Sequence, residues 1–143
     1  GRFLAVEAVI FGRRAMGETV QHGGLHDRWR IRQAERLIHA DDIRMSGAVA
    51  ALGQRSAVLA GAGAMASIVY VGEDADVQID AVRTALGDRG GASAWNGKLV
   101  ARLVAEGHLG VHAGVDGGRW LAPTASGLAV ADGMATAFSI PLP

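Results

Sequence analysis

Alternating side chains at the start of the chain predict β-strands, because successive residues of a strand point to opposite faces of its sheet. Residues 3–11 are apolar on both faces, which predicts a strand sandwiched between two layers of structure. A turn with two glycines is predicted over residues 12–17, followed by a short second strand over residues 18–21. Glu7 interrupts an apolar face of the first strand, and is therefore the first candidate for a functional side chain.

The next two segments, residues 25–33 and 36–45, predict a pair of half-buried antiparallel strands after a turn at residues 22–24. In the first strand, one face is formed by Leu25, Asp27, Trp29 and Ile31. Its other face is a polar row of His26, Arg28, Arg30 and Arg32. The more apolar face of the second strand consists of Leu37, His39, Asp41, Ile43 and Met45.

Beyond this pair the regular alternation is interrupted. Residues 46–64 are small and rich in glycine, and predict a loose connection or short edge strands. Residues 66–74 predict a buried strand. Residues 91–107 predict a strand that is broken by a turn near Asn96 and Gly97.

One helix is predicted over residues 75–86, where apolar residues recur at helical spacing. Asp74 is placed to cap its start and Gly87 to end it. After Gly107 glycines recur without a sustained period, and we expect this tail to be poorly ordered. The pattern as a whole predicts a mainly β fold.

Composition narrows the classes of function. The chain has 143 residues, enough for one domain with a modest core, and its acidic and basic residues balance at 14 each. That balance argues against nucleic acid or an anionic membrane as a partner, and no run of about 20 apolar residues is present to span a bilayer. The chain has no cysteine, which excludes disulfides and thiolate metal sites. Because residue 1 is glycine and a strand begins at once, we expect a fragment of a longer chain.

The carboxylates of Glu7, Asp27 and Asp41 are predicted on the more apolar faces of their strands. A buried carboxylate is costly unless it is paired, so one interpretation is an ion pair or hydrogen-bonded group that fixes strand register. The other is that these side chains line a wet internal passage. Without thiolates, carboxylates and imidazoles are the side chains that suit a borderline divalent cation. His39 is predicted beside Asp41, and either hydrogen-bonds to it within the core or joins the same polar lining.

Other charged positions are also open to two interpretations. The row of Arg28, Arg30 and Arg32 is either a solvated strand face or a docking surface for an acidic protein. His108 and His112 have the i, i+4 spacing of a helical metal pair, although the surrounding glycines disfavour a helix. The chain contains neither a GxxxxGK[ST] phosphate loop nor a GxSxG nucleophile motif.

Three stretches of the sequence resemble one known family. They are "VEAVIFGRRAMGETV", "GLHDRWRIRQAERLIHADDIRMSG" and, further on, "ASAWNGKLVARL". In this order they are similar to the second half of the urease accessory protein D family, called H in some organisms, over about residues 2–107. The resemblance implies a scaffold and not an enzyme, built as a two-layered, β-helix-like antiparallel array with one or two helices near its C-terminal side.

The resemblance also implies partners and a cargo. Family members act in the cytoplasm, bind urease apoprotein and recruit accessory protein F and the GTPase G. Nickel passes in transit through an internal tunnel to the urease active site, and no tightly bound cofactor is implied. Candidates to line the nickel path are Glu7 and, in the family's "AMGE" motif, Glu18, together with Asp27, Asp41 and His39.

Two departures from the family pattern divide the chain. The first half of the family's chain is absent, including strands expected to pair with residues 3–11, so residues 1–107 correspond to the C-terminal half of its β domain. Residues 108–143 lack the amphipathic helix expected there. We expect them to be an atypical glycine-rich tail, either disordered or produced by a frameshift.

Three hypotheses about function remain. The leading one is a non-enzymatic urease maturation factor that scaffolds nickel delivery. The second is a small hydrolase or lyase with acid–base chemistry by Glu7 or Asp41 together with His39, which requires the groups used to converge in one cleft. The third is a purely structural β interaction domain, which is favoured if each carboxylate is tied to an arginine.

Overall fold

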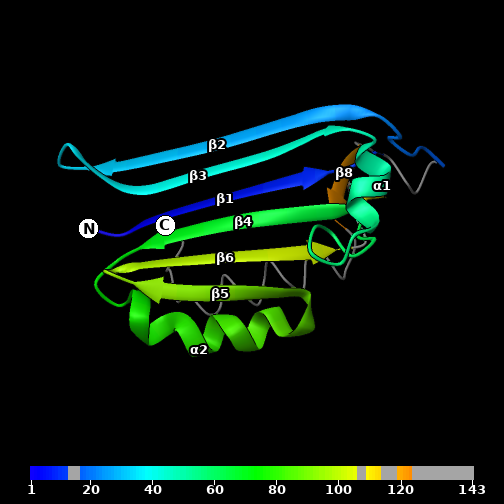
Figure 1. Cartoon of the computed structure of the whole chain (residues 1–143). Helices are drawn as coiled ribbons and strands as arrows, with labels where there is room; N and C mark the ends of the chain where they lie inside the picture. Colours follow the sequence, from blue (N-terminus) through cyan, green and yellow to red (C-terminus); the bar gives the residue numbers. More distant parts are fainter. Residues whose placement is uncertain (13–16, 106–108, 114–118, 124–143) are drawn as a thin grey trace. The chain divides into compact units, whose positions relative to one another are not determined.

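The computed structural model describes residues 1–12, 17–105, 109–113 and 119–123. These residues form mainly antiparallel strands with the α-helices α1 and α2, which confirms the predicted fold class (Figure 1). The chain divides into two compact units. We call them the sheet unit, residues 1–18 and 62–143, and the hairpin unit, residues 19–61.

The sheet unit is built on a four-stranded antiparallel sheet with the strand order β1-β4-β6-β5. The middle strands β4 and β6 are the most buried, as their long apolar runs predict. Because β1 pairs with β4, the hydrogen bonds of the sheet join segments that are far apart in the sequence. The strands are β1 (Phe3–Ile10), β4 (Ala64–Val71), β5 (Gly90–Trp95) and β6 (Lys98–Ala105).

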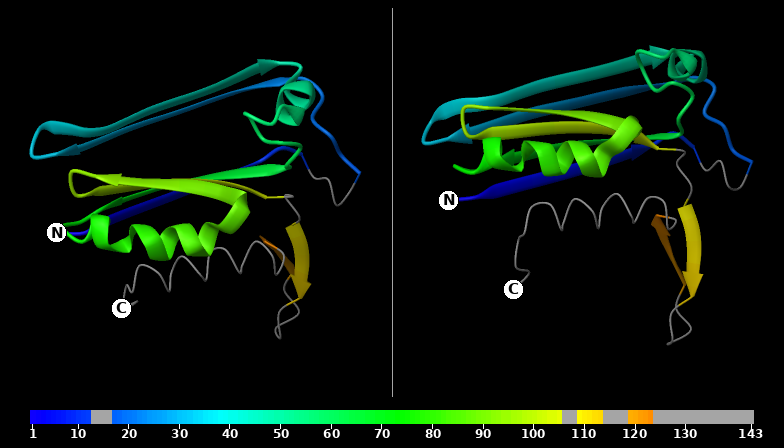
Figure 2. Two further views of the ribbon diagram at one scale, coloured as in Figure 1. Left: turned by 60° about the horizontal axis from the view of Figure 1, so that its bottom comes forward. Right: turned by 90° about the horizontal axis from the view of Figure 1, so that it is seen from below.

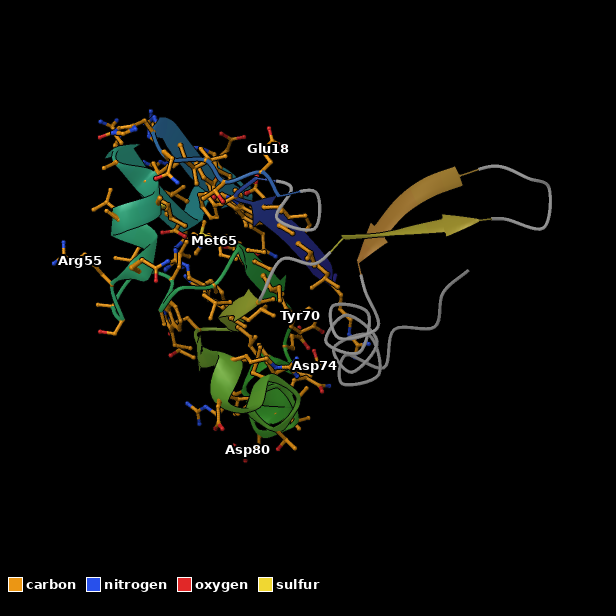
Figure 3. All side chains as sticks on the ribbon, turned by 90° about the vertical axis from the view of Figure 1, so that its right-hand side faces the viewer. Glu18, Arg55, Met65, Tyr70, Asp74 and Asp80 are labelled. Atoms are coloured by element: carbon orange, nitrogen blue, oxygen red, sulfur yellow. The ribbon has the colours of Figure 1, made fainter. Side chains whose placement is uncertain are left out.

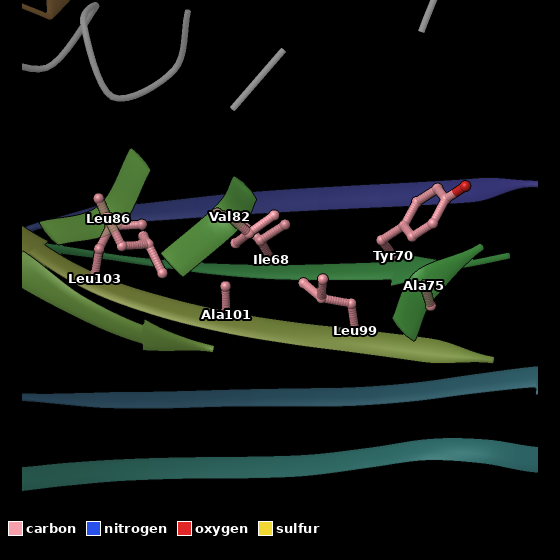
Figure 4. Close-up of a cluster of buried hydrophobic side chains, with 8 residues drawn as sticks. All are labelled: Ile68, Tyr70, Ala75, Val82, Leu86, Leu99, Ala101 and Leu103. Atoms are coloured by element: carbon pink, nitrogen blue, oxygen red, sulfur yellow. The ribbon is translucent and has the colours of Figure 1, made fainter. Parts of the chain in front are cut away.

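Helix α2 (Ala75–Leu86) covers one face of this sheet, as Figures 1 and 2 show. Its bounds are those that the apolar stripe predicts, and Gly87 follows as the C-cap with a φ of 54°. The apolar core lies between the helix and the sheet, and burying such side chains contributes about 1.5–3 kcal/mol each. Figure 4 shows its members, which are Ile68, Tyr70, Ala75, Val82, Leu86, Leu99, Ala101 and Leu103.

Strand β1 is not sandwiched, and in this respect the prediction for residues 3–11 is wrong. On the side of the sheet that α2 occupies, Leu4, Val6 and Ile10 keep 37%, 63% and 39% of their surface exposed. The reason is that the core under α2 takes its sheet side chains from β4, β5 and β6. The other face of β1, which carries Glu7, is half-buried except at Phe3.

The predicted break within residues 91–107 is confirmed. Asn96 and Gly97 have φ values of 53° and 68° and form the tight turn between β5 and β6. Further along, strands β7 (Leu109–Ala113) and β8 (Arg119–Pro123) pair antiparallel, which the glycine-rich pattern of the tail had not predicted. His112 lies in β7, so it does not belong to a helical metal pair, and His108 lies outside the described residues.

The hairpin unit consists mainly of β2 (Gly23–Gln33) and β3 (Arg36–Gly47), which form a long two-stranded sheet. The pair confirms the strands predicted over residues 25–33 and 36–45. Its ladder begins at Gly23 and Gly24, which pair with Gly47 and Ser46. Strand β2 therefore starts inside the turn that was predicted at residues 22–24. The strand predicted over residues 18–21 is wrong, because residues 18–21 have no strand structure.

A β-bulge changes the alternation near the tip of the hairpin. Ile31 is opposite His39, but the next residue, Arg32, is opposite Leu37, so Ile38 is the extra residue of β3. Leu37 is consequently 44% exposed and Ile38 half-buried. The assignment of Leu37 to the apolar face is therefore wrong, whereas Met45 is buried on that face as predicted.

The loose connection predicted over residues 46–64 contains a short helix, α1 (Val49–Gln54). Its sequence VAALGQ is rich in good helix formers, and this local preference outweighs the glycine content of the region. Close packing explains the glycine at position 53, since a Cβ atom there would lie 3.4 Å from Cδ1 of Leu59. Strand β4 then begins at Ala64, two residues earlier than predicted.

Candidate functional site

One face of the hairpin is more buried than the other, and it carries the ionisable side chains predicted there. Asp27 and Asp41 are half-buried and His39 keeps only 8% of its surface exposed. Trp29 stands opposite Asp41, and its ring meets the His39 ring edge-on with centroids 6.5 Å apart. Alternation therefore predicted correctly that these groups share a face with apolar residues.

These side chains follow one another along the hairpin and do not form a compact chelate. Asp27 pairs with Ile43 and Asp41 with Trp29, so the two carboxylates are diagonal neighbours, about 7–8 Å apart at their Cα atoms. Asp41 also accepts a hydrogen bond of 3.0 Å at Oδ1 from the backbone N–H of Asp42. Among the described residues, no three His, Asp or Glu side chains come close enough to hold a metal ion. The acid–base hypothesis for these groups stays a prediction.

Glu7 lies in a polar row on the face of the central sheet opposite α2. The register places it directly across from Ser67, and Ser67 directly across from Arg102. A guanidinium two strands away on the same face is a natural counter-charge for a half-buried carboxylate. The row offers a structural explanation for Glu7 that competes with a role on a nickel path.

Glu18 lies apart from regular structure. It is exposed and belongs to the stretch of residues 17–22 that precedes β2. Residues 13–16 of the "FGRRAMGE" motif lie outside the described residues. A role for Glu18 in nickel transfer stays a prediction.

The opposite, exposed face of the hairpin presents Arg28, Arg30 and Arg32 as predicted. Two of them are hydrogen-bonded to backbone. Arg30 donates from Nη1 to the carbonyl oxygens of Trp29 and Asp41, at 2.7 and 2.9 Å. Arg32 donates from Nη1 to the carbonyl oxygen of Glu35 at 3.2 Å. The row is therefore more ordered than free side chains in water.

Asp42 joins this face from the neighbouring strand, a connection that the sequence pattern did not reveal. Its carboxylate accepts a hydrogen bond of 3.2 Å from Nε2 of His26 and lies 3.5 Å from Nε of Arg44 and 3.9 Å from Nε of Arg28. The hydrogen bond from His26 is the largest cause that holds the pKa of Asp42 below its usual value, and the charges of His26, Arg44 and Arg28 act in the same direction against desolvation.

A second network lies at the start of α2 and was also missed. Asp74 was predicted to cap the helix, but its side chain makes no capping hydrogen bond. Instead it accepts hydrogen bonds from the Tyr70 hydroxyl at 2.5 Å, from Arg2 at 3.1 Å and from Gln78 at 3.3 Å. Figure 3 shows Tyr70 and Asp74 side by side. A Cβ atom at Gly72 would lie 2.8 Å from Oδ1 of Asp74, so glycine leaves room for this contact.

The two acids of this network shift in opposite directions. Burial, followed by the hydrogen bond to Asp74, raises the pKa of Tyr70. The hydrogen bond from Tyr70 is the largest cause that lowers the pKa of Asp74, helped by Gln78 and by the charge of Arg2. Such a network stabilises the start of α2 and ties it to Arg2, the residue directly before β1.

Lys98, the only lysine of the chain, is buried at the β5–β6 turn. Its Nζ lies 4.3 Å from the centroid of the Trp95 ring, a distance at which a cation is attracted to the ring face. Burial lowers the pKa of Lys98. The pair accounts for the Trp and Lys of the "AWNGK" stretch as structural residues of the turn.

The fold and the site thus define a mainly β protein that presents charged and metal-compatible side chains along its strands. In the part of the chain that the structure describes, no helix is long and apolar enough to cross a membrane. The sequence matches the family described as UreD urease accessory protein over residues 1–117. The chain belongs to this family.

Individual relatives agree with the family match. The chain is 56% identical over 104 residues to urease accessory protein UreD of Rhizobium leguminosarum bv. viciae, which covers 72% of the chain and 38% of that protein. It is 48% identical over 103 residues to urease accessory protein UreD of Agrobacterium fabrum strain C58, covering 72% and 36%. The corresponding protein of Methylobacterium sp. strain 4-46 is 47% identical over 107 residues, covering 69% and 38%. The chain therefore spans less than two fifths of the length of these relatives.

Proposed function

We propose that the chain is part of a non-catalytic urease maturation factor that scaffolds the delivery of nickel into urease apoprotein. Family membership supports the accessory role. The observation that supports nickel delivery is the row of Asp27, Asp41 and His39 on one hairpin face. These metal-compatible side chains follow one another along the strands, and the described residues contain no three-ligand site. Oxygen and imidazole ligands hold a borderline cation less firmly than thiolates do, which suits a conduit that must release its cargo.

The hairpin row gives the direct test of nickel transfer. Asp27→Asn and Asp41→Asn keep side-chain size and an oxygen acceptor, so the hydrogen bond from the Asp42 backbone to residue 41 is retained. With both changes in the full-length protein, we expect the complex with urease to form and the nickel content of the matured urease to fall. The measurement is nickel per urease active site, beside a pull-down of the complex.

A matched control is Asp80→Asn on α2, where the carboxylate is 92% exposed and lies 3.9 Å from Arg83. It removes the same charge at a position outside the row, so nickel loading should stay normal. Normal loading in the Asp27/Asp41 double variant as well would leave the row structural and remove the observation on which the conduit rests.

Glu7 and Glu18 are tested in the same assay. If they line the path, replacing both with Gln lowers nickel loading without affecting assembly. If Glu7 instead balances Arg102 across Ser67, Glu7→Gln leaves nickel loading unchanged, and the charge exchange Glu7→Arg with Arg102→Glu restores the stability that Glu7→Arg alone removes.

The proposed partners are urease apoprotein and accessory proteins F and G, with the complex assembled in the cytoplasm. Arg28, Arg30 and Arg32 supply an exposed cationic surface for one of them. Reversing all three to Glu should weaken the complex. The difference in binding between this variant and the wild type should diminish as salt is added to both. An unchanged pull-down of urease and accessory protein F would return the row to a solvated strand face.

A further inference from the structure

The cationic surface of the hairpin is wider than the row on β2. Arg44 of β3 stands opposite His26, and Asp42 stands opposite Arg28, so both share the exposed face with the row. On the described strands, this face carries four arginines and a single carboxylate, that of Asp42. We call it the arginine face: Arg28, Arg30, Arg32 and Arg44, with Asp42 in its middle.

We propose that the arginine face docks an acidic segment of a partner protein, and that Asp42 is a built-in competitor that occupies Arg28 and Arg44 until carboxylates of the partner replace it. The proposal deepens the proposed function and rests on it only in taking the partner to be a protein of urease maturation. Asp42 stands in the free protein where a carboxylate of the partner would stand in the complex.

The contacts of Asp42 have the character of a replaceable ligand. Its side chain is 40% exposed, and the side chains of Arg28 and Arg44 are 59% and 71% exposed. Ion pairs this exposed gain little, because water and salt screen them. A partner that brings several carboxylates at once can therefore exchange with Asp42 without disrupting a buried interaction.

The rest of the face is arranged to accept such a partner. Backbone carbonyls hold Nη1 of Arg30 and of Arg32, which orders these side chains before binding and reduces the entropy lost on docking. Residues two apart on a strand are separated by about 6.6–6.8 Å. This spacing matches carboxylates on alternate residues of an extended segment, which an arginine fork recognises well.

Charge argues for a protein partner over a nucleic acid. Domains that bind nucleic acid are usually strongly basic as a whole, whereas this chain has a formal net charge of zero and a pI of about 7.2. A carboxylate in the middle of a phosphate-binding surface would also repel its ligand. Against a protein, the same carboxylate raises specificity, because only a segment with enough negative charge displaces it.

The test measures binding of a fluorescein-labelled peptide of alternating Glu and Thr to the full-length protein by anisotropy at low salt. Asp42→Asn should tighten binding about three- to tenfold by removing the competitor, and Asp42→Thr should do the same with a residue that favours strands. Arg44→Gln should weaken binding. Asp80→Asn is the matched control, with a carboxylate near Arg83 on another surface, and should leave binding unchanged.

The sign of the Asp42 effect decides the proposal. Weaker or unchanged binding in both folded Asp42 variants would overturn the competitor role. Equal binding of a Gln–Thr peptide, or tighter binding of a single-stranded DNA of equal charge, would overturn the acidic protein partner. Because no urease is present, failure here is distinct from failure of the proposed function, which is read from nickel in matured urease.

Discussion

The sheet unit and the hairpin unit differ in what their alternating strands place on their more buried face. In the sheet unit, the face under α2 is mainly apolar, with Ile68, Leu99 and Ala101 at 1%, 0% and 1% exposure. In the hairpin unit, the more buried face mixes carboxylates and an imidazole with apolar residues, and Asp41 stands directly across from Trp29. The same period-two pattern thus builds an apolar core in one unit and a polar row in the other.

The difference determines how much each unit contributes to stability. Apolar burial is the dominant favourable contribution to folding, so the sheet unit should supply most of the stability of the chain. Half-buried carboxylates oppose folding unless they are paired. Asp41 has such a partner in the backbone N–H of Asp42. The hairpin carboxylates are therefore expected to contribute less to stability than the apolar core, and this contrast can be tested residue by residue.

The largest effect is expected from a leucine in the apolar core. Leu99→Ala removes a fully buried side chain and should lower the free energy of unfolding by about 2–5 kcal/mol. Leu37→Ala is the matched change on the hairpin, where the side chain is 44% exposed, and should have an effect of about 0.5 kcal/mol. Urea unfolding of both variants checks this. Equal losses would break the contrast between the two units.

A smaller effect is expected from a pair of adjacent glycines on β5. A Cβ atom at Gly90 would collide with the backbone oxygen of Arg102, whereas at Gly91 it would meet nothing within 4 Å. Gly90→Ala should therefore destabilise the protein by about 1–3 kcal/mol through strain, and Gly91→Ala should be close to neutral. Thermal unfolding measures both variants. An unchanged melting temperature in Gly90→Ala would mean that β5 and β6 pair less closely at this position than the structure shows.

Elements with a purely local signal were predictable from the sequence. The stripe of Ile79, Val82 and Leu86 defines α2, and the Asn96–Gly97 turn defines the β5–β6 hairpin, because helix periodicity and turn chemistry are encoded in neighbouring residues. The faces of β2 and most of β3 also followed from alternation. The sequence pattern placed Asp27, Asp41 and His39 correctly for this reason.

Features that depend on pairing between distant residues were not predictable in this way. The bulge at Ile38 depends on register, and it reversed the face of Leu37. Asp74 was assigned as a helix cap, but Tyr70 and the distant Arg2 engage its carboxylate instead. The sequence pattern revealed only the β2 part of the arginine face, because Asp42 and Arg44 belong to the neighbouring strand β3.

The Tyr70–Asp74 network should contribute less than the apolar core. Tyr70→Phe removes the hydroxyl that donates to Asp74 and should lower the melting temperature by about 2–4 °C. The lowered pKa of Asp74 means that its contribution is fully present above the model-peptide value of 3.8 and is lost as pH falls through its lower folded pKa. Asp74→Asn should therefore flatten the loss of stability on acidification. An acid profile identical to that of the wild type would show that the network contributes nothing.

The smallest effect on stability is expected from Asp42, although its pKa is lowered too. By the same sign, its contribution is present above 3.8 and lost as pH falls below that value. Its partners His26, Arg28 and Arg44 are 42%, 59% and 71% exposed, however, so added salt should screen most of the contribution. Asp42→Asn should consequently match the wild type in melting temperature at 0.5 M salt, a concentration at which the screening length is only about 4 Å. Asp74→Asn should stay different from the wild type there, because the hydrogen bond from the buried Tyr70 hydroxyl is poorly screened. A salt-resistant loss in Asp42→Asn would make Asp42 a structural residue of the hairpin, and it would then be a poor candidate for a side chain that gives way to a partner.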